Sequence, residues 1–219
     1  MTITLVLMAG LMALFVGWLV SQSISVTPWV ADAGPVRSSA ATSMTSAKVG
    51  LFVFLAVVSS LFALFISAYH MRMHMGDWRP LPEPRILFVN TAILFLASVG
   101  LQWAWRSATH GDSLGIMRGL AAGGVGAVVF IAGQLLAWQQ LVASGYFLTT
   151  NPANAFFYVL TAMHGLHLLG GLVAWSRTAL KVWRGSDVQA VRLSVELCAI
   201  YWHFLLILWL VLFYLMLST

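Results

Sequence analysis

Charged residues are scarce in this chain, making up only 8% of 219 residues, while 61% of the residues are hydrophobic. A soluble globular domain carries about a quarter charged residues, so this composition excludes a water-soluble enzyme or binding domain. It also excludes an intrinsically disordered chain, because disorder requires a low content of apolar residues. The composition therefore indicates a protein that resides in a membrane.

Cysteine is also nearly absent. The single cysteine, Cys198, lies in an apolar run, so no disulfide can form within the chain and the thiol is expected to pack as a small hydrophobe. The sequence contains no Cys-x-x-Cys pair, no Gly-rich phosphate-binding loop and no assembly of Ser, His and Asp. The sequence therefore offers no familiar catalytic motif that would indicate an active site.

What the chain does contain is long apolar runs. A helix rises about 1.5 Å per residue, so about 20 residues cross a hydrocarbon core of about 30 Å. Six runs meet this requirement: 2–21, 49–69, 86–105, 119–141, 155–176 and 193–217. They predict an all-α polytopic bundle of six spans. The first run lacks a basic residue before Arg37, which favours a span over a signal peptide.

Composition also divides the chain. We expect residues 1–22 to form an N-terminal transmembrane helix, and residues 23–47, rich in Ser, Thr, Ala and Pro, to form a loop or linker. Residues 48–219 then form a five-helix core. Many tryptophans lie near the ends of the runs, as in the aromatic belts of membrane proteins: Trp18, Trp29, Trp78, Trp103, Trp105, Trp138, Trp175 and Trp183.

The basic residues are distributed unequally between the two sides of the predicted bundle. The connections after the first, third and fifth spans hold eight Lys and Arg residues, and the connections after the second and fourth hold three. Basic residues accumulate on the cytoplasmic side, so both the N-terminus and the C-terminus are predicted to lie outside. The 11 Lys and Arg residues of these connections exceed the 6 Asp and Glu residues of the chain, which gives the net charge of +5. A nucleic-acid partner is therefore not expected.

A few polar residues interrupt the apolar runs, and intramembrane polar groups are the default functional candidates. The fifth run contains His164 and His167, and the sixth contains Glu196 and His203. Haem ligation by His164 or His167 together with His203 is one hypothesis, and a copper or zinc site is another. The preferred interpretation is that these residues make hydrogen bonds between helices, to Glu196 or to a lipid head group. Further polar residues in the third and fourth runs are Asn90, Thr91, Gln102 and Gln134.

A second candidate group is the segment His-Met-Arg-Met-His-Met at residues 70–75, just after the second run. Thioether and imidazole groups suit copper, so His70, Met73 and His74 are weak candidates for copper handling if the helix continues through them. The favoured interpretation is the end of a helix whose methionines contact lipid. A transporter is not favoured, because paired broken helices with ionisable groups at mid-membrane are missing.

Residues 151–172, with an aromatic pair, Leu-Thr, His164-Gly-x-His167 and a Gly-rich continuation, resemble the signature of subunit III of haem–copper oxidases. The last run is similar to the last helix of that family, and the resemblance extends from Lys48 to the end of the chain. The matching residues of the last run are Glu196, Tyr201, Trp202, His203, Phe204 and Trp209. Weaker matches in the earlier runs are Lys48, Gly50, Phe54, Leu55, Ala56, Asn90, Thr91, Gln134 and Trp138.

This resemblance implies an accessory, metal-free subunit of a cytochrome c or quinol oxidase, which reduces oxygen to water and translocates protons in aerobic respiration. The chain would have no active site of its own. Haem and copper are expected in the partner, catalytic subunit I, with subunit II as a further partner. Bound phospholipid and a bacterial-type plasma membrane are also implied.

The resemblance gives His164, His167, Glu196 and His203 structural or lipid-binding roles, and it places Arg177 near a lipid phosphate. Two alternatives stay open, namely an accessory protein of a nitric oxide reductase and a stand-alone haem- or copper-binding membrane protein.

The chain departs from the family at its intramembrane carboxylates. Apolar residues occupy the positions where the family carries acids associated with lipid binding, proton uptake or oxygen entry: Val57 and Val58, Ala137, and Leu205 and Leu206. The sequence therefore favours a scaffold over a proton conductor.

Overall fold

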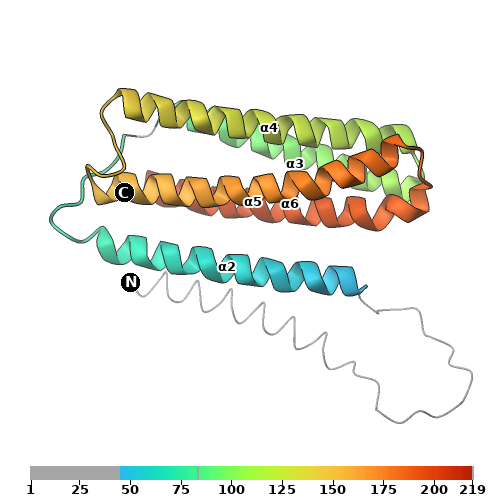
Figure 1. Cartoon of the computed structure of the whole chain (residues 1–219), viewed down its shortest axis with the longest axis horizontal. Coiled ribbons are helices and arrows are strands. Elements are labelled where there is room, and N and C mark those ends of the chain that lie inside the picture. The colour runs from blue at the N-terminus through green and yellow to red at the C-terminus, as the bar shows by residue number, and fades with distance from the viewer. Residues whose placement is uncertain (1–44, 83, 219) are drawn as a thin grey trace, which may run out of the picture. The chain divides into compact units, whose positions relative to one another are not determined.

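The computed structural model describes residues 45–82 and 84–218 (Figure 1). These residues contain five helices and no β-strand. The helices are α2 (Ser46–Arg72), α3 (Ile86–His110), α4 (Ser113–Ala143), α5 (Pro152–Trp183) and α6 (Val188–Leu217). Each is long and apolar enough to cross a membrane. The all-α class is confirmed, whereas the predicted span 2–21 and most of the linker 23–47 lie outside the described residues.

Helices α3 to α6 form a closed four-helix bundle in which each helix packs against two neighbours (Figure 1). Helix α3 contacts α4 and α6, and α5 contacts the same two helices. Helix α2 lies beside this bundle and contacts α5 and α6 through fewer residues. The bundle therefore has one interior, and α2 is its least embedded helix.

Capping residues set the ends of the helices. The side chain of Asp112 accepts a hydrogen bond from the Gly115 amide at 3.0 Å and starts α4. Asn151 starts α5 in the same way, with Pro152 at the first helical position. Gly111 ends α3 with a φ of 76°, a left-handed conformation that glycine adopts without strain. Only residues 111 and 112 therefore separate α3 from α4.

Small residues let the helices approach closely. A Cβ atom added to Gly119 of α4 would lie 2.5 Å from the backbone nitrogen of Ala104 in α3, so only glycine fits there. Gly171 of α5 similarly faces the rings of Tyr201 and Trp202. Gly165 and Gly170 of the same helix, in contrast, have nothing within 4 Å of an added Cβ. They face open space on this chain.

The interior and the exterior of the bundle are both apolar. Trp202, Trp209 and Phe130 are fully buried, whereas large side chains such as Leu64 and Val125 are exposed. An exterior of this kind suits hydrocarbon as the solvent, and helical backbone satisfies its own hydrogen bonds there. Specificity between helices must then come from shape and from the few polar side chains.

Candidate functional site

His203 of α6 joins α6 to α3 through both ring nitrogens. Its Nδ1 contacts the Ser98 hydroxyl, and its Nε2 lies 2.7 Å from Oε1 of Gln102. The Gln102 carbonyl oxygen can only accept, so Nε2 carries the proton and Nδ1 accepts from Ser98. The contact joins α6 to α3, whereas the sequence suggested Glu196 or a lipid head group as the partner. Neither nitrogen is free to bind haem iron.

Three indole N–H groups make similar connections between helices. The pairs are Trp209 with the Thr91 hydroxyl at 2.9 Å, Trp138 with the Thr161 hydroxyl at 3.1 Å, and Trp175 with the Leu120 carbonyl at 2.9 Å. The sequence placed Trp138 and Trp175 in an aromatic belt. Both instead direct their N–H groups into the bundle, where the hydrogen bond removes the cost of burying a polar group.

His164 and His167 have different surroundings although they are three residues apart. His164 is fully buried, and its ring lies 5.8 Å from the Phe130 ring and 5.2 Å from the Trp209 ring. The Nδ1 of His167 lies 2.7 Å from the Met163 carbonyl of its own helix, and its ring lies 5.5 Å from that of Phe62 in α2. His164 therefore packs against α4 and α6, whereas His167 packs against α2.

Glu196 forms an ion pair with Lys48, which joins α6 to the start of α2. Lys48 Nζ lies 2.5 Å from Glu196 Oε1, and the side chains are 27% and 23% exposed. The sequence suggested Glu196 as a partner for a histidine, whereas the carboxylate pairs with a lysine. The ion pair adds a polar link to the limited packing between α2 and the bundle.

Arg177, the candidate for a contact with a lipid phosphate, is exposed on α5.

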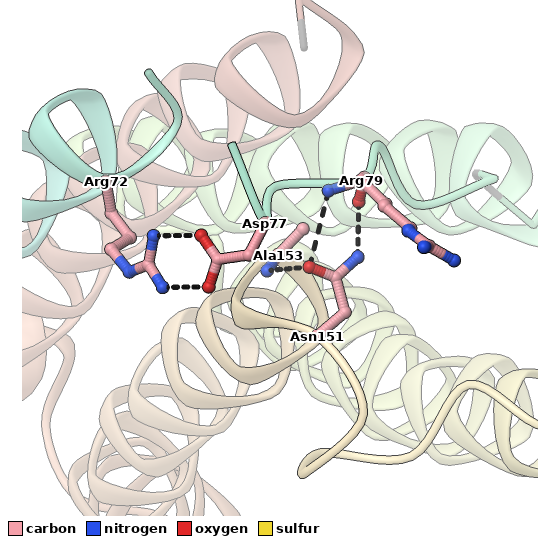
Figure 2. Close-up of polar contacts among 5 residues, drawn as sticks. All are labelled: Arg72, Asp77, Arg79, Asn151 and Ala153. Carbon is pink, nitrogen blue, oxygen red and sulfur yellow. Dashed lines mark hydrogen bonds and ion pairs between the residues drawn. The ribbon is translucent and has the colours of Figure 1, made fainter. Parts of the chain in front are cut away.

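The connection between α2 and α3 is tied to the start of α5 (Figure 2). The Asn151 side chain donates to the Arg79 carbonyl at 2.5 Å, accepts from the Arg79 amide at 3.4 Å and accepts from the Ala153 amide at 3.2 Å. Sequence reasoning did not find this contact. Asn before Pro at the start of a helical run is a capping signal, but it does not reveal the second partner.

Figure 2 also shows Arg72, at the end of α2, paired with Asp77 in the same connection. The guanidinium donates to both carboxylate oxygens, with Nη1 and Oδ1 2.6 Å apart. These charge-assisted bonds favour the ionised carboxylate and hold the pKa of Asp77 below its ordinary value. The Asn151 contact and this ion pair shape the connection between α2 and α3.

The candidate copper segment does not continue as a helix. Helix α2 ends at Arg72, so His74 is exposed in the following turn while His70 is half-buried at the helix end. The continued helix on which the copper hypothesis depended is therefore missing. Within residues 45–82 and 84–218, no group of three or more His, Cys, Asp or Glu side chains is placed to hold a metal ion.

The fold and these contacts define a polytopic α-helical membrane protein whose intramembrane polar side chains mainly join helices. The sequence model of one family, described as cytochrome c oxidase subunit III, matches residues 2–218. The chain belongs to this family. It is therefore an accessory subunit III of a haem–copper oxidase, a non-catalytic member of the complex, as the sequence resemblance implied.

Bacterial relatives agree with this assignment. Cytochrome c oxidase subunit 3 of Synechocystis sp. is 31% identical over 173 residues, which cover 75% of this chain and 72% of the relative. A probable cytochrome c oxidase subunit 3 of Nocardia farcinica is 28% identical over 192 residues, covering 85% and 94%. The subunit of Thermostichus vulcanus is 31% identical over 169 residues, covering 75% and 83%.

Proposed function

We propose that this subunit stabilises the catalytic subunit I of the oxidase, with subunit II as a further partner, in a bacterial plasma membrane. Haem and copper are carried by the catalytic subunit, and this chain contributes no ligand to them. The observation that carries the proposal is His203, both of whose ring nitrogens are bonded to α3. Residues engaged in this way hold helices together and are not free for metal chemistry.

A phospholipid-binding role is part of the same proposal. His167, Gly170 and Arg177 follow one another at helical spacing along one side of α5. Gly170 leaves open space, and the exposed Arg177 offers a cation near the predicted cytoplasmic end. A lipid phosphate near Arg177 with an acyl chain along Gly170 fits this arrangement. His164 and Glu196 then have structural roles, the latter through Lys48.

The proposal includes the organisation predicted from the sequence. Residues 1–22 form an additional span, residues 23–47 form a linker and residues 48–219 form the five-helix core. Both termini lie outside, which is supported by the excess of Lys and Arg in the connections on the opposite side.

Mass spectrometry of proteins that copurify with this chain tests the assignment of partners. We expect solubilisation in a mild detergent to recover a haem–copper catalytic subunit together with subunit II. Recovery of a nitric oxide reductase, or of the chain alone with a Soret band that is lost in His164→Ala, would contradict the proposal.

Native mass spectrometry of the same complex tests the lipid. We expect Arg177→Gln to reduce the amount of bound phospholipid, because the phosphate loses its cation. The matched control is Arg118→Gln. This substitution removes an exposed arginine near the predicted cytoplasmic end of α4. Equal loss of phospholipid in both variants would remove Arg177 from the proposed site.

A further inference from the structure

Three side chains in the bundle interior, those of Gln134, His164 and Trp202, are buried with no hydrogen-bond partner for any of their polar atoms among the described residues. Gln134 of α4 is 8% exposed and His164 of α5 is 0% exposed. The side-chain nitrogen and oxygen of Gln134 and both ring nitrogens of His164 have no partner among the described residues. Four unpaired polar atoms in an apolar interior are unfavourable, and such groups are usually satisfied by an ordered water when no side chain reaches them.

Gln134 and His164 lie about one helical turn apart along the α4–α5 interface. Two contacts set the register of the helices here, because the Phe130 ring of α4 lies 5.8 Å from the His164 ring and Trp138 of α4 donates to the Thr161 hydroxyl of α5. Gln134 lies one helical turn from both Phe130 and Trp138, on the same side of α4. This register places Gln134 beside the stretch of α5 between Thr161 and His164.

The directions of the helices bring the two polar groups toward each other. Side chains on a helix lean toward its N-terminus, and α4 and α5 run antiparallel. Gln134 therefore leans toward the level of Phe130, while His164 leans toward the level of Thr161. From this general lean we expect the amide and the imidazole to approach the same space between the two helices.

The chemistry of the two groups selects the ligand. A neutral imidazole offers one donor and one acceptor, and the glutamine amide offers both kinds of group. The rings of Phe130 and Trp209 flank His164 and supply no charge. A cation would lack a carboxylate here, whereas a water molecule can donate to and accept from both side chains. We infer that a water molecule is bound between the Gln134 amide and the His164 imidazole, bridging α4 to α5.

A cryo-electron microscopy map of the purified oxidase complex, at a resolution that shows ordered waters, tests this inference. The expected result is a water-sized density within hydrogen-bond distance of both the Gln134 amide and the His164 ring. A direct hydrogen bond between the two side chains, or an empty space between them, would overturn it.

Matched variants connect the density to these side chains. Gln134→Leu removes the amide and should abolish the density, whereas Gln139→Leu, an exposed position on the same helix, should retain it. A density that persists at the same place in Gln134→Leu would show that Gln134 does not hold the water.

Discussion

At the scale of single residues, His203 is bonded to a neighbouring helix through both ring nitrogens, with Ser98 on one and Gln102 on the other. We expect His203→Ala to destabilise the subunit by about 1–3 kcal/mol, because two polar groups in α3 lose their partner. The half-life of the complex at elevated temperature should fall more than its initial rate of oxygen consumption.

His110→Ala is the control for this substitution. His110 is exposed and bonds only within its own end of α3, to the Arg106 carbonyl and the Thr109 hydroxyl, so its loss should leave the half-life unchanged. An immediate and complete loss of turnover by the His203→Ala complex, with assembly intact, would indicate a direct part in catalysis.

The sequence identified the polar residues of the bundle but not their partners. A residue type and a position in an apolar run are enough to single out His203 or Glu196. The partner depends on how each helix is rotated and at what depth it packs, and Ser98 is 105 residues away from His203 along the chain. Neither the rotation nor the depth of a helix can be derived from the local sequence. The pairing of Lys48 with Glu196 was missed for the same reason.

At the scale of helices, the α3–α4 interface depends on glycine. We expect Gly119→Ala to destabilise the complex by about 1–3 kcal/mol, since the added methyl group meets the backbone of Ala104 and the helices must separate. The matched control is Gly165→Ala, because a Cβ atom there meets nothing within 4 Å. Thermal inactivation of the assembled complex measures both variants. Equal destabilisation by the two would show that the close approach is unimportant.

The ends of the helices were predicted less well than their existence. The run 119–141 is shorter than α4, which spans Ser113–Ala143, and the run 155–176 is shorter than α5, which spans Pro152–Trp183. Apolar content marks the part of a helix that crosses hydrocarbon, whereas caps mark where the hydrogen-bonded backbone begins. Asp112 and Asn151 are such caps, and they lie outside the apolar runs.

The connection between α2 and α3 should respond to acid through Asp77. Because the folded pKa of Asp77 lies below its ordinary value of 3.8, its ion pair with Arg72 contributes fully above that value and is lost as the pH falls through the folded pKa. Hydrogen exchange of backbone amides at residues 73–82, corrected for the intrinsic pH dependence of exchange, should then increase below pH 3.8.

The Asp77→Asn variant is the control for this acid response. It should show the increased exchange already at neutral pH, with no further change through this range, because asparagine does not titrate there. A transition centred above pH 3.8, or one that persists in Asp77→Asn, would contradict the assignment to Asp77.

At the scale of the whole molecule, the predicted orientation is testable by cysteine labelling. The single native thiol, Cys198, is buried, so a Cys198→Ala background gives a quiet starting point. With both termini outside, Thr149→Cys should react with a membrane-impermeant maleimide added to spheroplasts. Ser186→Cys should react only in inverted vesicles. Both positions are exposed, in the connections on either side of α5. The reverse pattern would invert the topology.

The two-residue link between α3 and α4 has a consequence for biogenesis. These two helices leave the ribosome one after the other, and they also make the most extensive contact in the bundle. Contacts that are close in sequence close with little loss of chain entropy. The α3–α4 hairpin is therefore suited to assemble during insertion, before α5 and α6 are synthesised. It then presents Ser98, Gln102 and Thr91 as a ready surface on which the last helix docks through His203 and Trp209.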